Sequence, residues 1–142
     1  MTDIRHQINV EGTPRAVYQA LSTIDGLSGW WTKTTSGKSA LDAEIDFRFG
    51  EHLCVMRVDG LDADRAVSWE CTTAAPDWLG TKVRFELDET GSGTRVRFAH
   101  TGWREANDFF AHCSTKWAVF MLSFERYVET GTGAPFPDDV QI

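Results

Sequence analysis

The fold of this chain is decided by residues 107–131, which read NDFFAHCSTKWAVFMLSFERYVETG. Their apolar residues recur at steps of three and four, the spacing of an amphipathic helix. Asn107 can cap the start of that helix and Gly131 can cap its end, so we predict one helix of about six turns between them. The apolar stripe consists of Phe110, Cys113, Trp117, Met121, Phe124 and Val128, and is widened by Phe109, Phe120 and Tyr127.

Immediately before this helix, residues 82–100 have the strict alternation of two half-buried strands. Gly91-Ser92-Gly93 lies between them and suits a tight turn that needs positive φ angles. We therefore predict a hairpin. Its inward face carries Val83, Phe85, Leu87, Val96, Phe98 and His100.

The first half of the chain is predicted to supply one more strand, two short helices and further strands. Residues 4–10 alternate as a strand, Thr13-Pro14 can open a short helix, and a second helical segment follows over 24–31. Residues 32–40 are polar and are predicted to be a loop. Further strands are expected over 44–49, 52–58 and 67–71, although residues 52–58 alternate poorly and their inward face stays open.

This order predicts an α+β helix-grip fold, with a curved antiparallel sheet of six or seven strands wrapped around the long C-terminal helix. The sheet must bury its apolar face, the helix covers it, and strong curvature leaves a cavity between them. The 142 residues fit a single domain, 1–142, in which residues 132–142 are expected to be a loosely attached tail.

Composition excludes several function classes. The net charge is −7 and no run of Lys or Arg is present, which counts against binding to nucleic acid or to an anionic membrane surface. No apolar stretch is long enough to span a bilayer. The first residues lack the features of a secretion signal, and the three scattered cysteines suggest free thiols, so we expect a cytoplasmic protein.

Three parts of the chain resemble a known family. They are Trp30-Trp31-Thr32, the segment from Gly93 to Trp103, and the long aromatic helix with Trp117 that ends near Tyr127-Val128-Glu129. The chain resembles the START-like, or SRPBCC, superfamily with its birch-pollen-allergen-like fold. It is most similar to the subfamily of the activator of the 90-kDa heat-shock-protein ATPase. The resemblance covers roughly residues 3–131. It implies the helix-grip fold, and it implies a chaperone partner only by analogy with the subfamily name.

The candidate site is an aromatic interior. The predicted pocket residues are Trp31, Trp69, Phe85, His100, Phe110, Cys113, Trp117 and Met121. Each aromatic ring by itself is explained by core packing, but rings from several elements that converge in a cavity-forming fold suit a small apolar ligand. Trp78 and Trp103 lie at loop edges, where they would form a mouth or a contact surface.

No catalytic, metal or cofactor motif accompanies these residues. His112 and Cys113 are adjacent in the sequence, so they point about 100° apart on a helix and cannot easily share a metal ion. His100 is the polar residue best placed to contact a ligand or to act as an acid or base; its alternative is a hydrogen bond to the protein itself.

Three functions therefore stay open. The first is binding or carriage of a small hydrophobic molecule, without a cofactor. The second is a cyclase- or hydrolase-type enzyme that uses His100. The third is a chaperone-cofactor-like interaction module. The exposed edge strands of the sheet also allow a homodimer.

Overall fold

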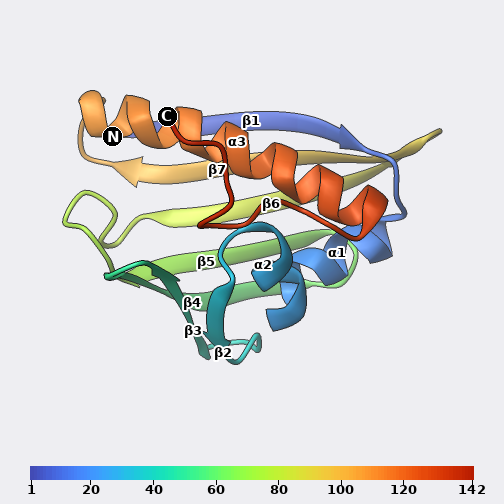
Figure 1. The fold of residues 1–142 in the computed structure, drawn as a ribbon, viewed down its shortest axis with the longest axis horizontal. Helices are drawn as coiled ribbons and strands as arrows, with labels where there is room; N and C mark the ends of the chain where they lie inside the picture. The colour runs from blue at the N-terminus through green and yellow to red at the C-terminus, as the bar shows by residue number, and fades with distance from the viewer.

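The computed structural model describes residues 1–142 and places one long helix across a seven-stranded antiparallel sheet (Figure 1). The strand order is β1-β7-β6-β5-β4-β3-β2, so the first strand lies beside the last. This arrangement confirms the predicted α+β helix-grip fold. No helix is long and apolar enough to cross a membrane. The elements are β1 Thr2–Val10, α1 Pro14–Ser22, α2 Ile24–Trp30, β2 Thr34–Gly37, β3 Glu44–Phe49, β4 His52–Asp62, β5 Ala66–Thr73, β6 Lys82–Thr90, β7 Gly93–Trp103 and α3 Asp108–Thr130.

The long helix α3 begins and ends where the capping residues predict. The Asn107 side chain accepts a hydrogen bond from the Phe110 amide at 2.9 Å, which satisfies one of the free N–H groups of the first turn. Gly131 closes the helix in the left-handed region at φ 84°, and its amide donates to the Tyr127 carbonyl. The buried face of α3 lies against the sheet and against α2.

The predicted hairpin is also confirmed. Strands β6 and β7 pair from Lys82 opposite Thr101 to Thr90 opposite Gly93, which leaves a two-residue turn at Gly91 and Ser92. The inward residues of the two strands meet across the sheet, so Phe85 and Phe98 lie side by side with ring centroids 5.2 Å apart.

Strand β4 alternates poorly in the sequence because Val55 is apolar and buried although it lies on the face opposite to Cys54, Met56 and Val58. Its register against β5 shifts between Val55 and Met56 and again between Val58 and Gly60. At the first shift the extra residue is Thr72 of β5, whereas at the second it is Asp59 of β4, and only the second breaks the inward–outward alternation of β4. Gly60 is required at the second bulge because a Cβ atom there would lie 2.4 Å from the Ser68 hydroxyl.

Two segments differ from the sequence expectation. Part of the predicted loop 32–40 forms the short edge strand β2, which pairs with β3. Residues 132–142, named here the C-terminal strap, fold back along the molecule from the end of α3 instead of hanging loosely (Figure 1). Two backbone hydrogen bonds hold the strap, from the Phe136 amide to the Trp31 carbonyl at 2.8 Å and from the Lys33 amide to the Phe136 carbonyl at 3.1 Å.

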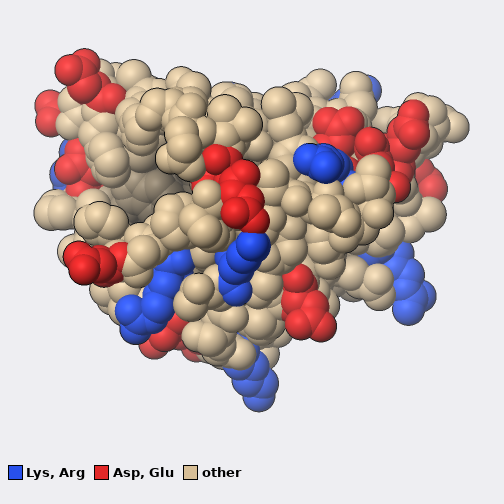
Figure 2. Space-filling model, viewed as in Figure 1, with Lys and Arg blue, Asp and Glu red and all other residues tan.

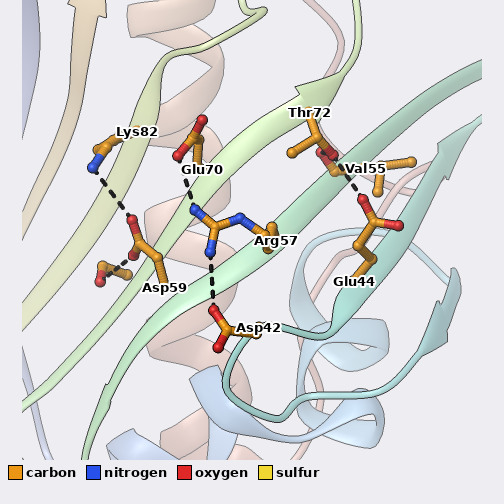
Figure 3. A network of polar contacts seen from close by, with 9 residues as sticks. Asp42, Glu44, Val55, Arg57, Asp59, Glu70, Thr72 and Lys82 are labelled. Carbon is orange, nitrogen blue, oxygen red and sulfur yellow. Dashed lines mark hydrogen bonds and ion pairs between the residues drawn. The ribbon is translucent and has the colours of Figure 1, made fainter.

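The outer face of the sheet carries a network of ion pairs (Figure 3). Arg57 contacts Asp42 at 3.1 Å and Glu70 at 3.0 Å, and Lys82 lies 3.5 Å from Asp59. Arg57, Glu70 and Lys82 come from positions that alternate with the buried residues of their strands, and Asp42 lies in the turn before β3. Because most of them are partly or largely exposed, each pair contributes little to stability.

Candidate functional site

A pocket of about 440 Å³ opens beneath the first half of α3. Figure 2 shows a hollow on the left of the molecule, below the start of α3 as seen in Figure 1, with mostly uncharged walls. Its volume falls in the range of pockets that hold small molecules. Nine of the fourteen lining residues are hydrophobic; the full set is Trp31, Phe49, His52, Trp78, Phe109, His112, Cys113, Lys116, Trp117, Phe120, Phe136, Asp139, Gln141 and Ile142.

Aromatic rings from separate elements form the inner wall. Trp117 of α3 lies between two other indoles: its centroid is 5.0 Å from that of Trp31, the residue after α2, and 5.9 Å from that of Trp78, in the loop after β5. Phe49, at the end of β3, lies edge-on to Trp31 at 5.4 Å. Four segments that are distant in sequence therefore fix the shape of this wall.

The C-terminal strap supplies the opposite wall through Phe136, Asp139, Gln141 and Ile142. The strap is attached to α3 as well as to Trp31, because the Ser123 hydroxyl accepts from the Ala134 amide at 2.8 Å. The strap consequently closes one side of the pocket.

The polar groups of the pocket are concentrated at its α3 and strap side. Lys116 forms an ion pair with the Asp139 carboxylate and donates to the Val140 carbonyl at 2.8 Å. The Asp139 side chain is fully buried, whereas that of Lys116 is 22% exposed. His52 and His112 complete the rim and are exposed.

His100 lies beneath the pocket, in a continuous series of hydrogen bonds that runs from Trp117 to Trp78. The Trp117 indole N–H donates to His100 Nδ1 at 3.1 Å, so the remaining proton of a neutral imidazole is on Nε2 and points at the Thr81 hydroxyl, 2.7 Å away. Thr81 in turn donates to the Trp78 carbonyl at 2.5 Å. Burial lowers the pKa of His100 to about 3, which keeps this ring neutral near pH 7. These hydrogen bonds connect the Trp117 indole to the main chain of Trp78.

The Cys113 thiol borders the pocket but has little nucleophilic character. Burial is the main cause that raises its pKa to about 11. A thiol needs to be a thiolate to react, so near neutral pH this side chain acts as an apolar wall residue.

The structure divides the predicted pocket residues into two groups. Trp31, Cys113 and Trp117 line the pocket, and so does Trp78, for which a mouth or a contact surface was expected. The others lie elsewhere in the interior: Trp69, Phe85, His100 and Met121 are buried in the core outside the pocket, and Phe110 packs half-buried against Trp103.

Sequence reasoning missed the Phe49, Lys116 and Phe120 parts of the wall, and the strap. One signal was available on α3, because residues 109, 112, 113, 116, 117 and 120 follow helical spacing and form a stripe that shares Cys113 and Trp117 with the apolar one. No comparable signal marked the strap. No group of three or more His, Cys, Asp or Glu side chains is arranged to hold a metal ion.

Comparison with known proteins supplies the family context. The family model described as activator of Hsp90 ATPase homolog 1-like protein matches residues 11–129. The solution structure of the Aha1 dimer from Colwellia psychrerythraea is 41% identical, with a TM-score of 0.87, and the match covers 94% of this chain and 100% of that one. A protein of Staphylococcus saprophyticus matches at 15% identity and a TM-score of 0.77, over 93% of this chain and 95% of its own.

A protein of Mesorhizobium loti gives a similar result, with 18% identity, a TM-score of 0.76 and coverage of 88% of this chain and 95% of its own. These two distant matches show the fold alone. No curated protein matches the sequence.

Proposed function

The chain belongs to the activator of Hsp90 ATPase homolog 1-like family, whose fold is of a ligand-binding type, and we propose that it binds or carries a small hydrophobic molecule. The observation that carries this proposal is the pocket beneath α3, with its aromatic wall of Trp31, Trp78 and Trp117. Apolar surface that is held open to water, instead of being packed, gains free energy when a ligand covers it. The free cysteines support a cytoplasmic site of action.

The contacts of His100 favour binding over acid–base catalysis. Both of its ring nitrogens are engaged inside the protein, and the ring does not border the pocket. A general base must reach the proton that it removes. The enzyme alternative therefore lacks the residue that the sequence suggested for it.

The proposal is tested by filling the pocket. Cys113→Phe places a ring into the wall, and we expect it to weaken binding of 2-methylnaphthalene, followed by tryptophan fluorescence, by at least about tenfold. Leu122→Phe is the matched control, because it adds the same ring on the same helix at a side chain that is 60% exposed. Equal affinity of Cys113→Phe and the wild-type protein would place the ligand elsewhere. No binding to the wild-type protein would remove the proposal for this class of ligand.

We also propose that the chain forms a homodimer, as its relative from Colwellia psychrerythraea does. The short edge strand β2, whose residues are mostly exposed, offers unpaired backbone groups for such contact. Sedimentation equilibrium over a range of concentrations measures the state directly. A monomer mass at every concentration would contradict this second proposal and leave the pocket proposal untouched.

A further inference from the structure

The charged side chains in the pocket wall are Lys116 and Asp139, and they neutralise each other. The other titratable groups there are the imidazoles of His52 and His112 at the exposed rim and the Cys113 thiol. Of the nearby acids, Asp77 accepts a hydrogen bond from Asn107, and Asp138 pairs with Lys33 outside the pocket. The polar end of the pocket therefore has hydrogen-bonding capacity but little net charge.

Neither Lys116 nor Asp139 uses all of its hydrogen-bonding atoms within the protein. A lysine ammonium has three N–H donors, and Lys116 directs two of them to Asp139 and to the Val140 carbonyl. Asp139 Oδ1 is buried and accepts no hydrogen bond. A buried polar atom without a partner is costly, so a ligand group that satisfies these atoms is favoured.

From this arrangement we propose that Asp139 is a specificity-determining residue, which makes the pocket select an uncharged aromatic molecule with one hydroxyl group. The inference rests on the proposed ligand-binding function. The ligand hydroxyl accepts the third hydrogen of the Lys116 ammonium and donates its own hydrogen to Asp139 Oδ1, while the rings of the ligand cover the aromatic wall.

The same geometry disfavours charged ligands. A ligand carboxylate at Lys116 is repelled by the Asp139 charge, and a ligand ammonium at Asp139 is repelled by Lys116. Because the Asp139 side chain is completely buried, water screens its charge only weakly. Removing this one negative charge should leave a lone ammonium at the pocket and so convert it into an anion site.

The test uses four probes that share one ring system and differ in the attached group: 2-methylnaphthalene, 2-naphthalenemethanol, 2-naphthoate and 2-naphthylmethylamine. All affinities are measured at the same pH, pH 8. For the wild-type protein we expect the alcohol to bind at least about tenfold more tightly than either charged probe, and several-fold more tightly than the hydrocarbon. For Asp139→Asn we expect the naphthoate affinity to rise by about tenfold or more.

Two further variants distinguish the effect of the Asp139 charge on ligand affinity from the effect of a loosened strap. Asp138→Asn removes the neighbouring ion pair of the strap with Lys33, whose side chains are both more than half exposed and do not line the pocket. It should leave every affinity within about twofold of the wild-type value. The double variant Lys116→Met/Asp139→Asn removes the donor together with both charges. It should bind the alcohol no better than the hydrocarbon, and should still not favour naphthoate.

Each result has a defined meaning. If the hydrocarbon and the alcohol bind but the wild-type protein does not discriminate against the charged probes, the inference is wrong and the proposed function stands. An equal rise in naphthoate affinity for Asp138→Asn and Asp139→Asn would also overturn it, because loosening of the strap would then be the cause. If no probe binds, both proposals fail. The wild-type measurements need no variant, so the test holds even if one of the variants does not fold.

Discussion

The two halves of α3 cover very different interiors. Beneath its second half, Phe124 is fully buried, lies edge-on to Trp30 at 5.3 Å, and is backed by Phe85 of the sheet. The short helices α1 and α2 fill the remaining space there, with Leu21 and Leu27 fully buried. Beneath its first half lies the pocket, which only the C-terminal strap partly closes.

The difference shows that aromatic content alone does not create a binding site. Both halves are lined by Trp and Phe, but α1 and α2 cover only one of them. The strap contributes few large side chains to the other half, so one side of the aromatic wall there faces the pocket instead of packed side chains. The packed half therefore carries stability, and the pocket half combines stability with ligand binding. Substitutions in the two halves should separate these properties.

The largest effect is expected from Phe124→Ala, which should break the packed half. Loss of a fully buried ring should lower the free energy of unfolding by about 3–5 kcal/mol, because a cavity replaces its contacts. The affinity of the remaining folded protein for 2-methylnaphthalene should stay within about twofold. Trp117→Ala should lower stability comparably and also abolish binding. Urea unfolding and fluorescence titration measure the two properties. If Phe124→Ala lost ligand affinity as Trp117→Ala does, the two halves would be a single unit.

The packed half was largely predictable from the sequence, and the pocket half was predictable only in part. Periodicity shows which way a residue points, so the inward positions of Phe85, Trp117 and Phe124 and the limits of α3 could be inferred. A cavity cannot be inferred in this way, because it depends on which side chains of distant segments leave space unfilled. No local pattern could show that Trp69 lies in the packed core while Trp78 borders the pocket.

The C-terminal strap shows the same limit more sharply. Its path depends on backbone pairing between Phe136 and Trp31 and on a polar pair between Asp139 and Lys116. These contacts join residues that are far apart in sequence and have no shared period. A segment with few apolar residues is expected to be loose. Here long-range contacts hold it in place.

A second prediction, with a smaller expected effect, concerns the pH dependence of stability. Acid should destabilise the pocket half, through His100, and not the packed half. Burial holds the pKa of His100 at about 3, below the value near 6.5 of an unfolded histidine. The unfolded chain therefore binds more protons between these values, and stability is lost as the pH falls through this window. The loss from this group should reach about 3 kcal/mol by pH 4.

The His100→Gln variant isolates the contribution of His100 to the pH dependence of stability. Glutamine can still accept from Trp117 and donate to Thr81, but it does not titrate. The stability advantage of the wild-type protein over this variant should shrink as the pH falls from 7 to 4, as measured by urea unfolding at each pH. An advantage that stays constant over this range would show that His100 takes up a proton without unfolding.

The smallest expected effect lies on the packed half and has the opposite sign. Glu125, on α3, has its pKa raised first by burial and then by the charge of Glu129 one turn later, with a contribution from Glu11. The folded protein therefore binds a proton at Glu125 more readily than the unfolded chain, so this group makes the protein more stable as the pH falls and less stable as it rises through that pKa. Glu125→Gln removes the repulsion and should raise stability at pH 7 by a few tenths of a kcal/mol, the usual size for like charges four residues apart on a helix.

The gain from Glu125→Gln should fade at acidic pH, where Glu125 of the wild-type protein is protonated and no longer repels its neighbours. Arg126→Gln is a suitable control, because it alters an exposed charge of the same helix at the next position. Acid would then act in opposite directions on the two halves of α3, loosening the half above His100 and strengthening the half that carries Glu125. Hydrogen exchange of the helix amides at pH 7 and pH 5, corrected for the intrinsic exchange rate, would resolve the two halves separately. Equal changes along all of α3 would mean that the helix responds as one unit and that the division between its packed and pocket halves concerns shape alone.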